Sequence, residues 1–232
     1  MPAASFVTSP TTASTRRVER ILSREMPDGV LPWHIIVLVL LPFAGGYYLS
    51  YLYRTVNALL ADRLIVDIGM DAAQLGLLTS VYLLVTAAVQ LPFGVLIDRH
   101  GPRRVQSALL VVASIGSLLF ALSDGFWGLL AGRALIGLGV ATALMTGIKA
   151  AVMWVPQERL TLASGILVMV GALGAVTATL PAELFVDRFG WRALFIALAA
   201  TTFVSALAIW LLVPEHKAKG SIAKRSHRPG LD

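Results

Sequence analysis

Long runs without a charged side chain alternate with short polar segments along the middle of the chain. Five uninterrupted runs cover residues 35–53, 75–97, 105–122, 160–182 and 193–213, and a sixth, 126–155, contains only Arg133 and Lys149 as charges. At a helical rise of about 1.5 Å per residue, runs of this length cross the hydrocarbon core of a bilayer. Backbone groups in lipid must be satisfied within the segment, and the runs lack the period-two alternation of barrel strands. The pattern therefore predicts an all-α polytopic membrane protein with six transmembrane helices.

The composition supports the same class. Of the 232 residues, 57% are hydrophobic and only 14% are charged, and the mean hydropathy is +0.78. A soluble domain carries roughly a quarter charged residues. This chain has too few of them to cover a water-facing surface, which excludes an ordinary soluble fold.

Positive charges are distributed unevenly between the two sides of the predicted bundle. Thirteen of the 19 Lys and Arg residues fall on the side that holds both termini, the turn near residue 100 and Arg159. Only Arg63, Arg188 and Arg192 fall on the other side. Because Lys and Arg accumulate on the cytoplasmic side, we expect both termini in the cytoplasm and the bundle in a cell inner (plasma) membrane. The net charge of +6 is then a topology signal, and no nucleic-acid partner is expected.

Three regions differ in composition. Residues 1–32 are rich in Ser and Thr and are expected to form a disordered cytoplasmic tail, with a transit peptide as the alternative. Residues 33–214 hold the six-helix bundle. Residues 215–232 are expected to be a basic cytoplasmic tail or a linker to another domain. The chain contains no Cys, which excludes disulfides and thiolate metal sites.

One charged turn occurs twice. LPFGVLIDRHGPRR at 91–104 and LPAELFVDRFGWRA at 180–193 share Leu, Pro, Asp, Arg, Gly and Arg in register, at an offset of 89 residues. Three predicted spans separate the two copies, so they lie on opposite sides of the membrane. Two three-helix units in inverted orientation produce this arrangement. The alternative is that short helix connections in membranes converge on these residue types.

The first copy carries residues suited to a mechanical role. Gly94 and Gly101 allow helix ends to approach closely and to turn. Asp98 follows the second span, where a carboxylate caps the next helix or pairs with Arg103 or Arg104. Such a cluster can hold one conformation and release it.

This turn resembles the signature loop of the major facilitator superfamily, with Pro102 in place of the usual first basic residue. RALIGLG at 133–139, FGWRALF at 189–195 and YLYRTVNA at 51–58 are also similar to family motifs, and the resemblance covers roughly residues 33–214. It implies a gate loop whose aspartate contacts the second half of the transporter in the outward-facing state. The residues assigned to the gate loop are Gly94, Asp98, Arg99, Gly101, Arg103 and Arg104.

The same resemblance implies that the chain is half of a fold. Family members carry twelve spans in two halves, so we expect a partner with six further helices, either a missing C-terminal half or a second copy of this chain. The Gly-Pro motif of drug/proton antiporters is absent from the fifth span, where GALGAVTATLP stands at 171–181. The sequence therefore does not favour a drug antiporter.

Polar residues within the spans are the candidates for a substrate path, because burying them in lipid is costly. In the first span they lie on or beside one arc of the helix, and the fourth span adds an arginine at a similar depth. Arg54 and Arg133 are expected to face one another across a vestibule and to favour an anionic solute, since the spans contain no carboxylate. The alternative is that each arginine binds backbone carbonyls or extends to the headgroups. The predicted substrate path is formed by Tyr47, Tyr51, Arg54, Asn57 and Arg133.

The fourth span carries two further patterns. Lys149 lies close to the inner boundary and is expected to extend to the cytoplasmic headgroups. Small residues near one side of the same span are typical of close helix packing. They are Gly128, Gly132, Gly139, Ala143 and Gly147.

Together these features predict secondary active transport of a small solute, with an organic anion as the candidate, by alternating access and with a possible role for a coupling ion. We do not expect an enzyme, a cofactor or a metal site, because the four His residues lie in loops or near the ends of the chain and no acidic residue or Cys lies within a span. The alternative is a truncated, non-transporting half or a membrane interaction or scaffold subunit.

Overall fold

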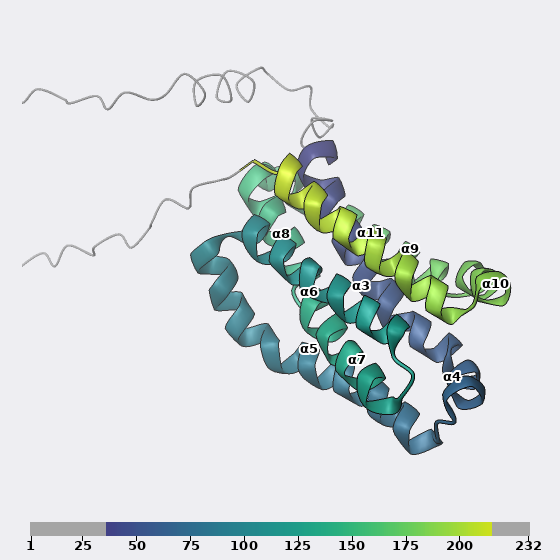
Figure 1. The fold of residues 1–232 in the computed structure, drawn as a ribbon. Helices are drawn as coiled ribbons and strands as arrows, with labels where there is room; N and C mark the ends of the chain where they lie inside the picture. Colours follow the sequence, from purple (N-terminus) through teal and green to yellow (C-terminus); the bar gives the residue numbers. More distant parts are fainter. Residues whose placement is uncertain (1–35, 215–232) are drawn as a thin grey trace, which may run out of the picture. The chain divides into compact units, whose positions relative to one another are not determined.

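The computed structural model describes residues 36–214, so the expectations for residues 1–32 and 215–232 lie outside the described part. The described chain is almost entirely helical (Figure 1). Its helices in chain order are the π-helix η1 (Ile36–Leu40), α3 (Leu41–Leu59), α4 (Ala61–Ile68), α5 (Ala72–His100), α6 (Pro102–Leu122), α7 (Phe126–Val140), α8 (Ala143–Trp154), the short 3-10 helix η2 (Gln157–Arg159), α9 (Leu160–Thr177), α10 (Leu180–Phe189) and α11 (Trp191–Leu212).

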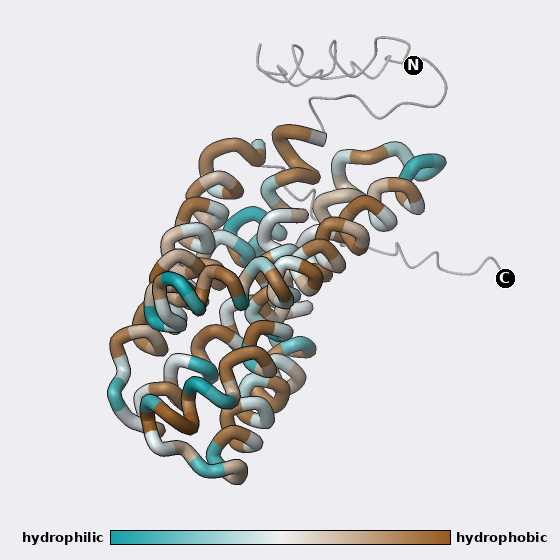
Figure 2. Tube along the Cα trace, turned by 90° about the vertical axis from the view of Figure 1, so that its right-hand side faces the viewer, coloured by the Kyte–Doolittle hydropathy of each residue, from teal (hydrophilic) through white to brown (hydrophobic). Residues whose placement is uncertain are grey.

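The six predicted spans are present as helices. They are formed by η1 with α3, α5, α6, α7 with α8, α9, and α11. Five of these stretches within residues 36–214 are long and apolar enough to cross a membrane. The exception is the first span, whose helix α3 contains Arg54 and Asn57 and is surrounded by α7, α8, α9 and α11. Figure 2 shows hydrophobic positions along most of each helix, with hydrophilic positions at turns and at a few points inside the bundle.

Two interruptions differ from the predicted spans. The fourth span breaks at Ala141 and Thr142 between α7 and α8, although no proline stands there. The Ser50 hydroxyl of α3 lies 3.4 Å from the Val140 carbonyl, which the break leaves without its helical partner. The fifth span ends at Thr177, and α10 begins as a separate helix at Leu180.

Small residues bring α6 and α7 into close contact. A Cβ atom added to Gly132 would lie 2.8 Å from the Phe120 backbone nitrogen, and one added to Gly116 would lie 2.8 Å from the Ile136 nitrogen. These distances leave no room for a side chain, as the stripe of small residues in the fourth span predicted.

On its other side α6 packs against α11. The Phe120 and Phe195 rings stack at a centroid distance of 4.3 Å. Two serines of α6, Ser114 and Ser117, donate 2.8 Å hydrogen bonds to backbone carbonyls of α11. Helices α6 and α11 therefore form a continuous packed pair.

Candidate substrate path and gate clusters

The polar residues of α3 form two groups. Tyr47 and Tyr51 meet edge to face, with ring centroids 5.1 Å apart and planes at 87°. Tyr47 is buried, whereas Arg54, one helical turn beyond Tyr51, is exposed. Arg54 lies within electrostatic range of Tyr47, so the two tyrosines and this arginine form one continuous polar strip on α3.

Asn57 lies one turn further along and connects α3 with α5. Its Nδ2 donates a 2.8 Å hydrogen bond to the Thr79 hydroxyl. Its Oδ1 is buried and has no hydrogen-bond partner within residues 36–214. An unused acceptor therefore remains at this point of the bundle.

Arg133 of α7 is only 1% exposed. Its guanidinium lies 4.7 Å from the centroid of the Tyr82 ring, which α5 contributes. Its Nε and Nη1 have no hydrogen-bond partner among the residues that the structure describes. A fully buried cation with two unused donors is costly, so this side chain has the strongest unmet requirement for an acceptor in the path.

The predicted facing of Arg54 and Arg133 across one vestibule is not what the structure shows. Arg133 is enclosed, whereas Arg54 is exposed. Tyr82 lies close enough to both arginines to interact electrostatically with each of them. The reason is that α5 covers the face of α7 from which Arg133 projects, and sequence periodicity does not reveal which neighbour covers a given face. A role for either arginine in substrate binding stays a prediction.

Several polar residues beside the candidate path or within the core of the bundle were not predicted. Tyr82 and Thr79 lie three positions apart on α5 and face Arg133 and Asn57, respectively. Buried Tyr53 hydrogen-bonds the Thr202 hydroxyl of α11 at 3.0 Å. The available signal was the presence of polar atoms within otherwise apolar runs.

At the end of the bundle that holds Gly101, a charged cluster connects four helices. Asp98 at the end of α5 forms an ion pair with Lys149 of α8. Arg103 at the start of α6 donates through Nε to the Trp210 carbonyl of α11 at 3.0 Å, and its guanidinium lies 5.1 Å from the Trp210 ring centroid. We call this set, with Gly101, the Gly101 cluster.

These contacts correct two expectations. Asp98 pairs with Lys149 from a distant part of the sequence, whereas Arg103 binds a backbone carbonyl. Helix α6 begins without a side-chain cap, so Asp98 does not cap it. The ion pair of Lys149 with Asp98 was not expected, and extension of Lys149 to the headgroups stays a prediction.

The two gate-loop glycines differ in outcome, because Gly101 forms the predicted turn whereas Gly94 marks no close helix approach. Gly101 adopts φ 80° and ψ 157°, a conformation that favours glycine, and it ends α5 by donating to the Ile97 carbonyl at 2.9 Å. A Cβ atom on Gly94 would meet nothing within 4 Å in the described part of the chain, so Gly94 does not mark a close helix approach there. The remaining gate-loop residues, Arg99 and Arg104, are exposed.

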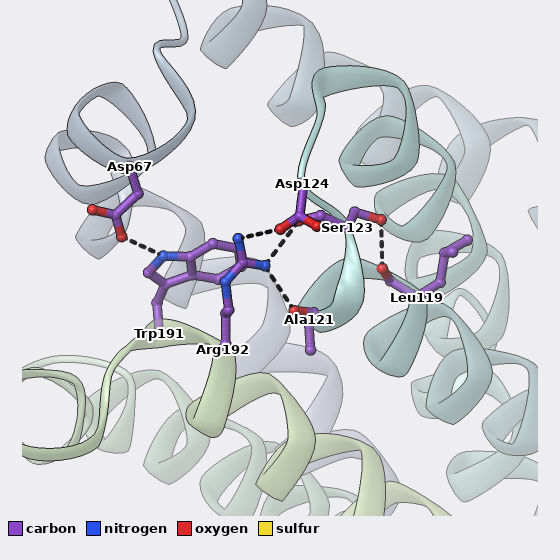
Figure 3. A network of polar contacts seen from close by, with 7 residues as sticks. All are labelled: Asp67, Leu119, Ala121, Ser123, Asp124, Trp191 and Arg192. Atoms are coloured by element: carbon purple, nitrogen blue, oxygen red, sulfur yellow. Dashed lines mark hydrogen bonds and ion pairs between the residues drawn. The ribbon is translucent and has the colours of Figure 1, made fainter.

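The opposite end of the bundle carries a second cluster (Figure 3). Arg192 at the start of α11 donates through Nη1 to the carbonyls of Ala121 (3.0 Å) and Ser123 (2.9 Å), and its Nη2 lies 2.8 Å from the Asp124 carboxylate. The neighbouring Trp191 donates through Nε1 to Asp67 at 2.8 Å.

An ion pair completes this cluster. Nη2 of Arg63 in α4 lies 2.5 Å from Oδ1 of Asp187 in α10. Gly190 ends α10 with φ 83° and ψ 160° and donates to the Val186 carbonyl at 2.8 Å. We call the set of Arg63, Asp187, Gly190 and Arg192 the Gly190 cluster.

The two clusters share the conformation of their turn glycine and an equivalent arginine bond to a distant carbonyl. Gly101 and Gly190 have nearly identical torsion angles. The bond from Arg103 to Trp210 and the bond from Arg192 to Ala121 connect positions that are equivalent under the 89-residue offset, with the roles of α6 and α11 exchanged. Convergence of two isolated turns does not explain matched long-range partners, so this correspondence supports the inverted repeat.

Comparison with known proteins decides the family. The profile of the Major Facilitator Superfamily matches residues 33–231. The chain belongs to this superfamily. It is therefore a multi-pass membrane protein of a family that transports solutes across bilayers, as the helices and the gate-loop motif predicted.

Individual members of the superfamily show how much of the fold is present. The chain is 29% identical over 210 residues to the efflux pump aunC of Aspergillus niger, covering 90% of this chain and 37% of the pump. It is 31% identical over 121 residues to the nitrate/nitrite transporter NrtP of Picosynechococcus sp., covering 52% of this chain and 22% of the transporter. The fold matches the inward-facing, unoccupied crystal structure of a bacterial homologue of the human lysosomal transporter Spinster, with a TM-score of 0.69 and 25% identity, covering 84% of this chain and 48% of that protein. The chain thus spans less than half the length of these relatives.

Proposed function

We propose that the chain is one six-helix half of a secondary transporter that moves a small solute by alternating access, together with a second six-helix half. Support for a partner comes from the length of the relatives, since the chain covers only 37% of the efflux pump aunC and 48% of the Spinster homologue. In the most apolar windows of α5 and of the segment that contains α9, only 11% and 22% of residues are buried, which leaves surface for such a partner as well as for lipid. The partner is either a C-terminal half joined beyond Asp232 or a second copy of this chain.

An organic anion is the proposed solute. The observation that carries this proposal is Arg133, a fully buried cation with two unused donors and no acidic partner in the described spans. Arg54 adds a second positive charge near Tyr47 on α3. A guanidinium binds carboxylate through directed, charge-assisted hydrogen bonds. One relative, NrtP, is named as a transporter of inorganic anions.

The proposed path runs along α3 from Tyr47 and Tyr51 past Arg54 to Asn57, with Arg133 reached when Tyr82 moves aside. Tyr82 is a suitable cover, because its ring lies over the Arg133 guanidinium while its hydroxyl makes a long 3.5 Å contact with the Ser50 carbonyl. Binding of an anion would supply an acceptor for Arg133.

For the orientation we propose that both termini and the Gly101 cluster lie in the cytoplasm and that the Gly190 cluster lies on the outer side of a cell inner membrane. The uneven distribution of Lys and Arg supports this placement. The Gly101 cluster would then act as the inner gate. No enzymatic activity and no cofactor are part of the proposal.

Uptake in proteoliposomes tests the proposal. The chain, alone and joined to the coding sequence that follows Asp232, is assayed with radiolabelled acetate and with nitrate. We expect Arg133→Ala to reduce uptake at least about tenfold, since it removes a charge-assisted contact, and Arg54→Ala to reduce it less. Arg188→Ala is the matched control, because Arg188 is exposed and lies in α10 outside the path. Unchanged uptake in both path variants would refute the anion proposal, and a monomeric chain without uptake in either form would favour the non-transporting alternative.

A further inference from the structure

The 89-residue correspondence extends to the aspartates of two ion pairs, whose basic partners lie at an offset of 86 residues. In each cluster an aspartate three residues before the turn glycine forms an ion pair with a basic residue from another part of the bundle. Asp98 pairs with Lys149, and Asp187 pairs with Arg63. The clusters are thus matched in backbone conformation, in the arginine bond to a distant carbonyl and in the aspartate ion pair.

Each aspartate is bonded to a helical segment that follows an interruption. Lys149 lies on α8, which follows the break at Ala141 and Thr142. Arg63 lies on α4, which begins after Leu60, where α3 ends. The junction between α3 and α4 keeps the backbone bonds from Leu60 to Asn57 (3.3 Å) and from Leu64 to Leu60 (2.9 Å), but the regular helical ladder is interrupted at both breaks. The segment beyond each break can therefore change its direction with few backbone hydrogen bonds lost.

A cavity lies at each end of the bundle. The cavity at the Gly190 cluster has a volume of about 350 Å³ and is lined by Asp62, Arg63, Val186 and Trp191, among others. The cavity at the Gly101 cluster is much smaller, about 30 Å³, and is lined by Gly101, Arg103 and Ala150, among others, but not by Asp98 or Lys149. Movement of Arg63 would therefore widen the first cavity directly, whereas movement of α8, which carries both Lys149 and Ala150, would widen the second.

We propose that Arg63 and Asp187 form a second latch, equivalent to the Asp98–Lys149 pair, and that each latch controls access to its own end of this half independently of the other. The inference rests on the proposed alternating access for its purpose, because a transporter must open its two ends at different times. The physical argument does not depend on transport. The Arg63 and Asp187 side chains are 52% and 51% exposed to water, so their ion pair is weak enough to open without unfolding the bundle.

The absence of cysteine from the chain makes the test direct. Two buried reporters are introduced one at a time. Val186→Cys, at a position 5% exposed, reports solvent access at the Gly190 end. Ala150→Cys, at a position 1% exposed, reports solvent access at the Gly101 end. The rate of maleimide labelling of the full chain in detergent then measures how often each end opens.

Arg63→Gln should raise the labelling rate of the Val186→Cys reporter about two- to fivefold, the range for loss of an exposed ion pair, and should leave the Ala150→Cys reporter unchanged. Lys149→Gln should do the reverse. The charge exchange of Arg63→Asp with Asp187→Arg should restore slow labelling. Asp62→Asn is the matched control, because Asp62 lines the same cavity and is not a member of the Arg63–Asp187 pair.

The outcomes separate clearly. If either neutralisation raises labelling at both ends, the variant loosens the whole bundle and the idea of independent latches is wrong. If neither changes labelling, or if the charge exchange fails to restore it, the pairs are inert surface contacts. Labelling does not require a substrate, so a chain that fails the uptake assay can still show independent latches, and a chain that transports can still lack them.

Discussion

Replacement of Arg133 by methionine separates the stability of the bundle from its proposed activity. Methionine has a similar length and no hydrogen-bonding requirement. An unsatisfied buried polar group costs about 1–3 kcal/mol, so the two Arg133 nitrogens without a partner in the described part of the chain cost about 2–6 kcal/mol. The 4.7 Å contact with the Tyr82 ring offsets about 2 kcal/mol of this. Arg133→Met should therefore leave the purified bundle equally stable or up to about 4 kcal/mol more stable when no anion is added.

Thermal unfolding of the purified chain in detergent measures the first part of this prediction. Since 1 kcal/mol shifts the midpoint of a domain of this size by about 2–4 °C, an increase of several degrees is expected at the upper limit. Arg54→Met is the control and should shift the midpoint little, because Arg54 is exposed. The second part is loss of acetate and nitrate uptake in the Arg133 variant.

The reasoning fails if Arg133→Met lowers the unfolding midpoint by more than about 4 °C, because the guanidinium would then have a structural partner whose loss exceeds 1 kcal/mol. It also fails if the variant is more stable and transports anions as well as the parent. Greater stability with lost uptake is the result that a ligand-binding arginine requires, since functional sites commonly reduce the stability of the unoccupied protein.

Two further predictions concern packing and hydrogen bonding in the bundle, both read from thermal unfolding in detergent. Gly132→Ala should destabilise the chain by about 1–3 kcal/mol, because its Cβ would lie 2.8 Å from the Phe120 nitrogen, whereas Gly94→Ala, with open space around it, should be neutral or stabilising by up to about 1 kcal/mol. Equal effects of the two substitutions would contradict the close packing of α6 and α7. Tyr53→Phe should cost about 1 kcal/mol by removing the 3.0 Å hydrogen bond with Thr202, and an unchanged midpoint would show that this bond adds nothing.

The features that follow from local sequence were predictable. The length of each apolar run fixes the existence of a span, and the six expected spans are present. The Gly-containing turns were visible because Gly101 and Gly190 each need a backbone conformation that other residues rarely adopt. Gly132 and Gly139 belong to a stripe of small residues, and both prove to lie at a close helix contact.

The features that depend on tertiary packing were not predictable. Asp98 and Lys149 are separated by 51 positions, and Arg63 and Asp187 by 124. Nothing in the residues around Asp98 distinguishes this partner from the nearer Arg103. The break between α7 and α8 follows Gly137 and Gly139, which weaken a helix locally, but the contact of the Ser50 hydroxyl of α3 with the Val140 carbonyl could not be predicted. Enclosure of Arg133 depends on Tyr82 of α5, which hydrophobic periodicity does not assign to a neighbour.

The two arginine bonds show which part of this half is held most firmly. Arg103 at the start of α6 binds the last turn of α11, and Arg192 at the start of α11 binds the last turn of α6, so the two helices are antiparallel and each caps the other. A guanidinium at a helix C-terminus satisfies free carbonyls and interacts favourably with the helix dipole. Because both ends of this pair are closed in the same way, α6 and α11 provide a fixed support. In contrast, α8 is joined to α5, and α4 to α10, through exposed ion pairs, and α5 and α10 are the helices that precede α6 and α11 in the chain. An inverted repeat explains why the two ends are alike. The turn whose Arg103 caps α11 at one end of the bundle recurs three helices later, and there its Arg192 caps α6 at the opposite end.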